Sequence, residues 1–488
     1  MPPAPALETR SAAGRWVIAA TVLGSGMAAI DGTVVGIALP VIGRQFHVPI
    51  ASLQWVLTGY LLSLAALLLV GGTLGDLFGR RRVFLVGVVW FALASAACAL
   101  APNVTVLVVT RLLQGVGAAL LVPGSLAIIQ ASFSPDDRGR AIGTWSGLGG
   151  VATAAGPLLG GYLITAASWR WIFVINLPVA AVVWAVAARH VPETRQETAR
   201  PRLDATGAAL TVVSLAGITY ACIEGPALGW GHTSVLALLA VGLGAAAVFV
   251  AVEGRRAEPM VPLALLRLQQ FRVVNLVTLL VYAALGGALF LLPVELEVVD
   301  RYSPLDAGLS LLPLTFLMLV LSGRSGRLAA RIGPRLQMTV GPLLVGTGLA
   351  MLARASGDAS YVTGVLPAVI VFGLGLATTV APLTATAMAA LPSAHAGLAS
   401  AVNNDVSRIG GLVAVALLPA LAGMAGRTYL HPGAMGAAFR TAVYVSAAWC
   451  GAGAVVAALG IRNPRRVPPA GAECSHCALD AAPLAGSR

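Results

Sequence analysis

Long apolar runs separated by short polar segments make up most of the chain. A helix needs roughly 20 apolar residues to cross a lipid bilayer, where only helices and closed barrels satisfy every backbone group. The runs lack the alternation over about 10 positions that is typical of barrel strands. The pattern therefore predicts an all-α polytopic membrane protein with 14 spans. They are expected near residues 17–40, 53–74, 83–101, 104–129, 141–166, 171–188, 207–223, 234–252, 273–294, 305–322, 336–353, 361–390, 398–422 and 439–461.

The spans fall into two groups of six with an additional pair between them. This grouping divides the chain into five predicted parts. They are a cytoplasmic N-terminus (1–15), an N-terminal six-helix half (16–190), a linker with two additional spans (191–260), a C-terminal six-helix half (261–462) and a disordered cytoplasmic tail (463–488).

Composition and charge agree with a membrane protein. Hydrophobic residues make up 58% of the chain and charged residues only 10%, a balance that soluble domains do not have. The chain contains no Lys, and 23 of its 31 Arg residues lie in segments on the side of both predicted termini. Cytoplasmic loops collect positive charge, so both termini are expected in the cytoplasm and the protein in the inner membrane. The net charge of +12 then reflects topology and contact with anionic lipids, and nucleic acid is not expected as a partner.

An internal repeat relates the two groups of six spans. The segment 72–81 recurs as 326–335 with the same spacing of Gly, Leu, Gly and Arg, each time between the second and third spans of a group. Transporters use such repeats to rock one half against the other around a site near the bilayer midplane.

Four motifs, in order along the chain, resemble the major facilitator superfamily, specifically its fourteen-span drug:proton antiporters. Segment 30–40, with Asp31, resembles their first-span pattern, and 72–81 resembles the superfamily's signature loop. The fourth-span and fifth-span patterns follow at 107–119 and 156–161. The residues that carry the last three motifs are Gly72, Asp76, Gly79, Arg80 and Arg81; Arg111, Gln114 and Gly115; and Gly156, Pro157, Gly160 and Gly161.

The resemblance implies a major facilitator fold and a function. It implies proton-coupled efflux of small amphipathic compounds, hydrophobic cations or neutral antibiotics, by alternating access, in a protein that works as a monomer. No cofactor or metal is implied. The alternatives are an uptake symporter, a lipid or metabolite exporter of the same fold and, from another class, a membrane-embedded enzyme.

Two charged residues inside predicted spans are candidates for proton coupling. An ionised Asp31 in the first span is costly unless it meets water, a cation or a proton, so its occupancy can drive exchange; the alternative is a plain helix-to-helix hydrogen bond. Arg111 cannot deprotonate and needs an acid or a cluster of carbonyl oxygens as partner. The resemblance implies that Arg111 modulates proton release from Asp31, and the alternative is a static ion pair.

The signature loop and the fifth-span motif predict gating and helix packing. Asp76 is expected to hold a charge–dipole contact with the other half, a contact that the resemblance places in the outward-facing state. Arg80 and Arg81 serve this gate or only orient the chain. Gly156 and Pro157 are expected to give a kink and a groove for a neighbouring helix.

Other charged residues are secondary candidates. Asp405 and Arg408 are spaced i, i+3 and are expected to pair on one helix, with a role in proton or substrate binding as the alternative. Glu295 and Glu297 make an outer segment more acidic than the resemblance leads one to expect, and we interpret them as solvated loop charges. Ala330 stands where the first loop copy has its acid, so only the first half offers an acid for gating.

Enzyme and metal chemistry find little support in the sequence. No nucleotide-binding Gly-Lys-Ser/Thr pattern is present, nor a catalytic cluster in a sizeable aqueous loop. The tail carries Cys474 and Cys477 around a His, but this set offers at most three of the four ligands that zinc takes.

Overall fold

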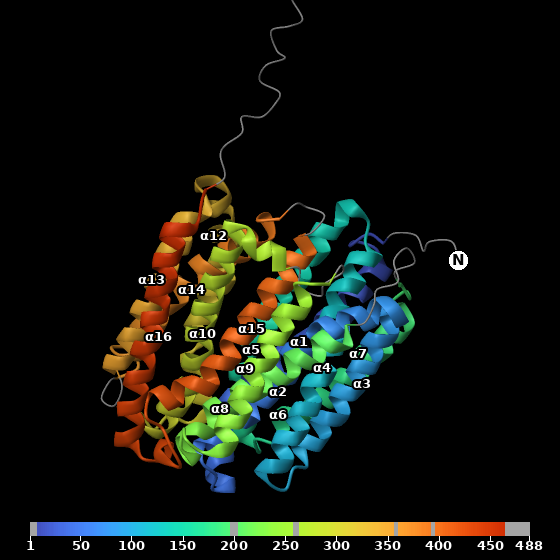
Figure 1. Ribbon diagram of the computed structural model, residues 1–488. Helices are drawn as coiled ribbons and strands as arrows, with labels where there is room; N and C mark the ends of the chain where they lie inside the picture. The colour runs from blue at the N-terminus through green and yellow to red at the C-terminus, as the bar shows by residue number, and fades with distance from the viewer. Residues whose placement is uncertain (1–6, 196–203, 257–262, 356–359, 392–395, 464–488) are drawn as a thin grey trace, which may run out of the picture.

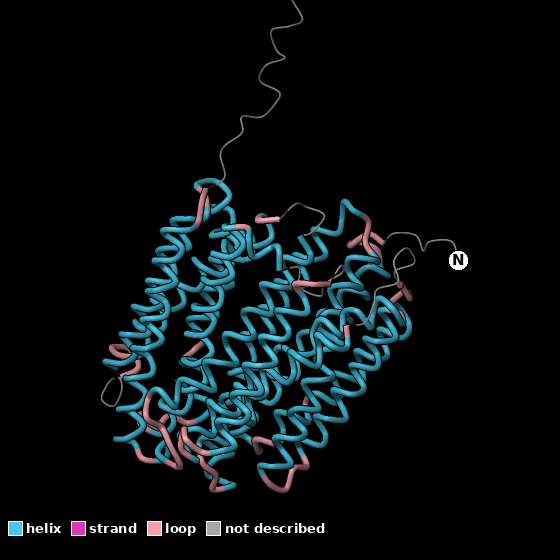
Figure 2. Tube along the Cα trace, in the orientation of Figure 1, coloured by secondary structure: helices cyan, strands magenta, loops and turns pink. Residues whose placement is uncertain are grey.

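The computed structural model describes residues 7–195, 204–256, 263–355, 360–391 and 396–463. Within them, 14 helical segments are long and apolar enough to cross a membrane, which confirms the predicted number. Figure 2 shows them joined by short loops. The helices are α1 (Ala12–Phe46), α2 (Ile50–Phe78), α3 (Arg80–Ala99), α4 (Val104–Ser132), α5 (Pro135–Ala166), α6 (Trp171–Val174), α7 (Asn176–His190), α8 (Ala205–Leu228), α9 (Thr233–Glu253), α10 (Gln269–Val298), α11 (Pro304–Ser310), α12 (Leu312–Ile332), α13 (Pro334–Ala355), α14 (Val365–Ala389), α15 (Ala396–Leu421) and α16 (Pro432–Gly460), with short 3₁₀ turns at Leu263–Arg267 and Thr428–Leu430.

Most helices extend beyond the apolar runs that predicted them. α1 is capped at Ser11, whose hydroxyl accepts a hydrogen bond of 3.0 Å from the N–H of Gly14, so the helix starts before its apolar core. Two predicted spans are divided, 171–188 into α6 and α7 and 305–322 into α11 and α12. Pro313, in the first turn of α12, has no N–H to continue the preceding helix, which accounts for the second break.

The two loop copies have the same backbone conformation. Gly79 between α2 and α3 has φ 104°, and Gly333 between α12 and α13 has φ 90°, a region that favours glycine. In each half, the helix that follows this glycine is then bonded to a side chain just past the end of that half. Glu193 accepts a hydrogen bond of 3.1 Å from the N–H of Arg81 on α3, and Asn463 accepts one of 3.0 Å from the N–H of Arg335 on α13. The internal repeat is therefore structural as well as sequential.

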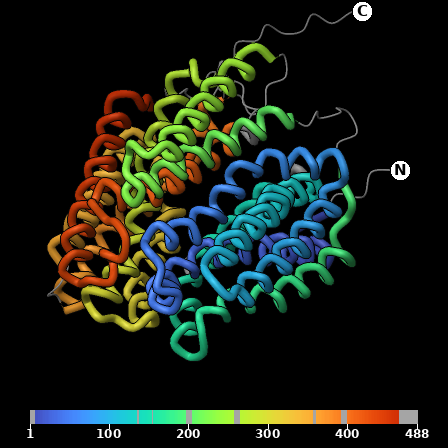
Figure 3. Tube along the Cα trace, turned by 60° about the horizontal axis from the view of Figure 1, so that its bottom comes forward, coloured from blue at the N-terminus to red at the C-terminus, as the bar shows by residue number. Residues whose placement is uncertain are grey.

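The helices form two groups with a hairpin beside them. Figures 1 and 3 show the N-terminal helices in blue to teal on one side and the C-terminal helices in yellow to red on the other. α8 packs against α2 and α15, one helix from each group, through Leu215, Leu62 and Leu412. The indole N–H of Trp55 on α2 also donates a hydrogen bond of 2.9 Å to Glu224 on α8.

The polar start of α8 is tied to the end of α9. Asp204 accepts a hydrogen bond of 2.7 Å from the N–H of Gly207 and forms an ion pair with Arg256. Burial of this carboxyl acts to raise its pKa, but the Gly207 N–H and Arg256 outweigh burial and hold the pKa of Asp204 below its ordinary value. The hairpin is therefore closed by an ionised carboxylate.

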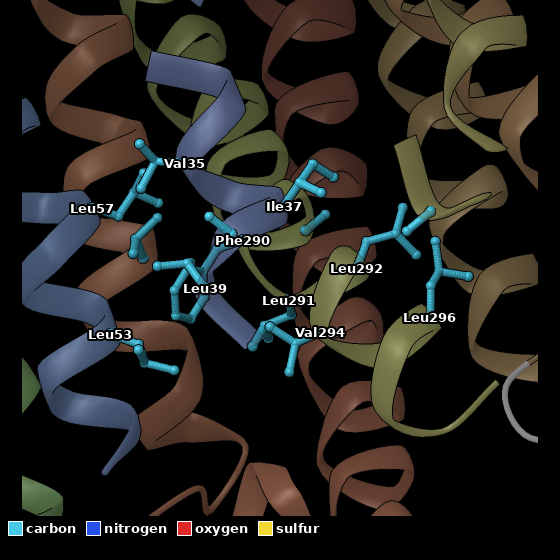
Figure 4. Packing of buried hydrophobic residues seen from close by; sticks show 14 of the residues in the cluster. Val35, Ile37, Leu39, Leu53, Leu57, Phe290, Leu291, Leu292, Val294 and Leu296 are labelled. Carbon is cyan, nitrogen blue, oxygen red and sulfur yellow. The ribbon is translucent and has the colours of Figure 1, made fainter. Parts of the chain in front are cut away.

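The hydrogen bonds and ion pairs identified between the halves lie at one end of the bundle. We call the end with 79–82 and the start of α5 the Arg-rich end, and the end with 47–49, 300–303 and 423–431 the Arg-poor end. At the Arg-poor end Tyr429 donates a hydrogen bond of 2.9 Å to the carbonyl of Val48. Leu39 of α1 and Phe290 of α10 belong to one buried apolar cluster there (Figure 4).

The Arg-rich end of α5 is open by contrast. A side-chain carbon placed at Gly143 or Gly147 would meet no other atom within 4 Å. Within the described residues, polar contacts thus join the halves at the Arg-poor end, whereas α5 is uncovered at Gly143 and Gly147 toward the Arg-rich end.

Candidate functional site

Asp31 and Arg111 form an ion pair in the middle of the N-terminal half. Asp31 lies on α1 and Arg111 on α4, and neither side chain is exposed to solvent. As expected from the sequence, the partner of the buried Arg is an acid. Two charges in such surroundings are stable only with each other and with further hydrogen bonds, because desolvation of either alone is costly.

Two amide side chains complete the hydrogen bonding of the Asp31 carboxylate, and a serine bonds to both of them. Gln114, one turn beyond Arg111, donates to Asp31 Oδ1 at 2.8 Å, and Asn176 at the start of α7 donates to the same oxygen at 3.1 Å. Ser95 on α3 accepts from both amides, at 2.8 and 3.3 Å. The carboxylate thus joins α1, α4 and α7, so a change in its charge changes the contacts of all three helices.

α2 supplies the other side of the Arg111 environment. The guanidinium donates from Nε to the carbonyl of Val56 (3.1 Å), and its carbon lies 4.4 Å from the ring centre of Tyr60. Gly115 makes this approach possible, because a side-chain carbon there would meet the backbone N of Leu64 at 3.2 Å and closer atoms besides.

A cavity of about 180 Å³ lies between the two halves, and Gly32, which follows Asp31 in the chain, is part of its lining. Its lining is almost entirely apolar, and the only lining hydroxyl, that of Thr33, donates to backbone carbonyls such as that of Ile30 (3.0 Å). The lining residues are Gly32, Thr33, Gly36 and Ile37 of α1, Leu57 and Leu61 of α2, Pro157 of α5, Gly286, Leu289, Phe290 and Pro293 of α10, Leu311, and Gly411 and Val415 of α15. The cavity suits an apolar body, which small-molecule sites commonly bury.

The fifth-span motif packs α5 against both halves. A side-chain carbon at Gly160 would meet Val34 of α1 at 2.5 Å, and one at Gly161 would meet the Pro304 carbonyl oxygen of α11 at the same distance. Gly308 of α11 is similarly close to the carbonyl of Pro157. The predicted groove is therefore present, and it is shared by α1 and α11.

The signature loop makes its contacts within its own half. Asp76 forms an ion pair with Arg80 at 2.8 Å, with both side chains partly exposed. Arg81 and Arg82 approach Glu193 at 3.8 and 4.0 Å. The expected contact of Asp76 with the other half is not among the contacts identified, as is natural in a bundle that is open at this end.

The interpretation of Glu295 and Glu297 as solvated loop charges is wrong. They lie in the last turns of α10, and both are buried. Glu297 forms an ion pair of 3.0 Å with Arg44 at the end of α1. The helix continues four residues beyond the predicted span, so it buries both acids and carries Glu297 into the interface between the halves.

The expected pairing of Asp405 with Arg408 is also not found. Both side chains are partly buried on α15, and within the described residues no ion pair or hydrogen bond joins them. Asp405 Oδ1 and Arg408 Nε are buried without a hydrogen-bond partner there. The spacing i, i+3 permits a pair but does not require it.

Sequence reasoning missed three residues around the ion pair: Ser95, Asn176 and Tyr60. Each is a polar side chain in an otherwise apolar span, which is the only signal that could have singled them out. Many Ser, Thr and Tyr residues in these spans give the same signal and merely bond to their own helix, as Ser125 does to the carbonyl of Leu121 (3.0 Å).

Comparison with known proteins bears on this site directly. The family model described as Major Facilitator Superfamily matches residues 21–415. The chain belongs to the Major Facilitator Superfamily. The match spans α1 to most of α15, and so includes every element that contributes to the ion pair and to the cavity.

Curated relatives in this superfamily include transporters named for resistance. The chain is 37% identical to the multidrug resistance protein Stp of Mycobacterium tuberculosis, over 82% of this chain and 74% of the relative. It is 36% identical to the tetracenomycin C resistance and export protein of Streptomyces glaucescens, with the same coverage. It is 38% identical to a puromycin resistance protein of Streptomyces alboniger, over 82% of this chain and 80% of the relative.

Solved structures of more distant transporters share the fold. A bacterial homologue of the human lysosomal transporter Spinster has a TM-score of 0.66 and 16% identity, covering 93% of this chain and 99% of its own. A peptide transporter POT in complex with sulfate has a TM-score of 0.65 and 14% identity, covering 92% and 96%.

No group of three or more His, Cys, Asp or Glu side chains that could hold a metal ion occurs in the described part of the chain. The tail residues Cys474 and Cys477 lie outside the described residues.

Proposed function

We propose that this protein exports small amphipathic compounds of the antibiotic kind from the cell by exchange for protons. The observation that carries the proposal is the Asp31–Arg111 ion pair, which is fully buried one helix face away from an apolar cavity between the halves. Relatives that are 36–38% identical over 82% of the chain are named for drug resistance, and one is named for export.

The ion pair links protonation to movement. With Asp31 ionised, the charge of Arg111 is balanced and α1, α4 and α7 are held together. When a proton neutralises Asp31, the guanidinium remains charged without its counter-ion in a buried place, which is unfavourable by several kcal/mol. Movement of the helices that hydrates Arg111 relieves this cost, and the halves rock with it.

The two ends of the bundle supply the gates. We assign 16–190 and 261–462 as the rocking halves and 191–260 as their connection. Arg placement supports cytoplasmic termini in the inner membrane, so the closed Arg-poor end faces outward and the described state is open inward. In this inward-open state Asp76 pairs with Arg80. When the cytoplasmic end closes, the Asp76 side chain contacts the other half instead.

Surrounding lipid and a monomeric unit complete the proposal. Large apolar side chains such as Leu93 (65% exposed) and Val362 (64% exposed) lie on the surface, where lipid would cover them. The ion pair and the cavity are formed within one chain, so a partner subunit is not needed to build either.

A loaded-cell experiment tests the direction of transport. Cells that express the protein are loaded with a fluorescent amphipathic dye, and the external medium is acidified. Exchange for protons predicts faster loss of dye than from cells without the protein. Faster accumulation of dye would instead support the uptake symporter.

A further inference from the structure

Asp405 and Arg408 stand out because no hydrogen bond or ion pair identified within the described residues satisfies them, whereas their polar neighbour on α15 is satisfied. Arg408 acts on Asp405 only through Coulomb attraction at longer range. Asn403 donates hydrogen bonds to Asn275 Oδ1 (3.1 Å) and to Thr278 Oγ1 (2.7 Å), both on α10. Asp405 Oδ1 and Arg408 Nε are buried and bond to nothing described. A buried polar group without a partner is costly, so these two groups call for a partner that is absent from the bundle itself.

The position of Arg408 relates this pair to the central cavity. Gly411 and Val415, three and seven positions further along α15, line the cavity. Three residues advance a helix by about 4.5 Å and return to nearly the same face. Arg408 therefore lies about one turn below the cavity, toward the Arg-rich end that is open along α5.

The residues that follow Arg408 on α15 pack against helices of both halves. Ile409 packs against the cluster that contains Leu62 of α2, and a side-chain carbon at Gly410 would meet the Leu279 carbonyl oxygen of α10 at 2.9 Å. Gly411 and Gly286 let α15 and α10 approach closely just above Arg408, because a side-chain carbon at Gly286 would meet Gly411 Cα at 2.6 Å. Arg408 thus lies about one helical turn from the cavity, and Asp405 about one turn further along the same face of α15.

The carboxylate of Asp31 does not compete for this role. It is 0% exposed and is already bonded to Arg111, Gln114 and Asn176. A ligand in the cavity therefore meets apolar walls and, at the Arg-rich side, one carboxylate and one guanidinium.

We propose that Asp405 and Arg408 bind the polar head of the exported compound, and that this head is dipolar, with a cationic amine for Asp405 and an acidic oxygen for Arg408. This inference rests on the proposed function and names its substrate class. The apolar body fills the cavity above. Closure of the Arg-rich end would dehydrate both charges, so a dipolar ligand that pairs with each makes closure with cargo more favourable than closure without it.

Four derivatives of naphthylalanine test the inference, because they share one apolar body. The free amino acid is zwitterionic, its methyl ester is cationic, its N-acetyl form is anionic and its N-acetyl methyl ester is neutral. Binding is measured by equilibrium dialysis with the purified full chain in nanodiscs. The native protein is expected to bind the zwitterion about a hundredfold more tightly than the neutral form, roughly tenfold for each of the two hydrogen-bonded charge contacts.

Substitutions separate the two halves of the head site. Arg408→Gln is expected to remove the advantage of the two forms with a free carboxylate, and Asp405→Asn that of the two forms with a free amine. Arg408→Lys keeps a cation and should retain part of the preference. Arg440→Gln, on the exposed surface of α16 at the Arg-poor end, is the matched control and should leave all four affinities unchanged.

The outcomes that overturn the inference are distinct from failure of the proposed function. Equal binding of the four forms by the native protein, or no binding of the zwitterion, overturns it. An equal loss of all four affinities in Arg408→Gln and Arg408→Lys, with a lowered unfolding temperature, assigns Arg408 a structural role and also overturns it. Proton-driven export without any charge preference leaves the proposed function intact, and a charge preference without export removes only the function.

Discussion

Arg44 at the end of α1 and Glu297 at the end of α10 form an ion pair of 3.0 Å that joins the two halves at the Arg-poor end. The Glu297 side chain is 1% exposed, whereas that of Arg44 is 48% exposed. The pair is therefore anchored in the protein on one side and screened by water on the other. It belongs to the same closed end as the hydrogen bond of Tyr429 to Val48.

Glu297→Gln is expected to weaken closure of the Arg-poor end. Half-exposed pairs contribute on the order of 1 kcal/mol, which corresponds to a shift of about fivefold in the ratio of closed to open molecules. Distances between spin labels on the two halves, measured by pulsed electron resonance, report this ratio. A double variant that swaps the two charges, Arg44→Glu with Glu297→Arg, should restore the ratio of closed to open molecules in part. An unchanged distance distribution in Glu297→Gln would show that the pair has no part in closure.

Gly161→Ala is expected to separate α5 from α11. The new carbon would lie 2.5 Å from the Pro304 carbonyl oxygen, so backbone must shift, at a cost of roughly 1–3 kcal/mol. Gly147→Ala on the same helix has open space and serves as control. Thermal unfolding and dye export should both fall in the first variant only. Equal behaviour of the two variants would contradict the packing described for α5.

Asp76→Asn is expected to impair transport with little change in stability. The Asp76–Arg80 pair is partly exposed, so its loss changes the free energy of unfolding by less than about 1 kcal/mol. The proposed contact with the other half in the alternate state would be lost as well, and the rate of export should fall at least tenfold. Arg82→Gln is the control. The Arg82 side chain is 79% exposed and its 4.0 Å contact with Glu193 is long for an ion pair, so this variant should export normally. Normal export by Asp76→Asn removes Asp76 from the gate.

Asp31→Asn is expected to abolish proton-coupled export while the protein stays in the membrane. It leaves Arg111 buried without its counter-ion, which lowers stability on the order of 3 kcal/mol. The double variant Asp31→Asn with Arg111→Gln is neutral at this place and should regain stability but not export. Susceptibility of expressing cells to antibiotics, together with membrane protein levels, measures both. Full resistance with Asp31→Asn would exclude Asp31 from coupling.

The sequence predicted the spans and the repeat because both depend on local patterns. Apolar length alone identifies a helix that lipid must cover, and the glycines at 79 and 333 keep their spacing because the chain needs φ above zero at each. The Asp31–Arg111 pair was predictable in kind, because a buried guanidinium needs an acid and few acids lie in the spans.

Packing across the halves was not predictable in the same way. Glu297 looked solvated because the last turn of α10 lies past the apolar run, and only the neighbouring α1 buries it. Asp405 and Arg408 had the spacing of a pair, but side-chain directions and neighbours on α10 and α2 decide whether a pair forms. Asn176 gave no more signal than any polar residue that bonds to its own helix.

Proton flux in liposomes tests the central claim most directly. Purified protein is reconstituted with a pH-sensitive dye inside, and an outward gradient of an exported antibiotic is imposed without a pH difference. Exchange through Asp31 predicts that protons enter as the drug leaves, in the native protein and not in Asp31→Asn. Protein-dependent movement of the drug down this gradient with no accompanying proton movement would contradict the account.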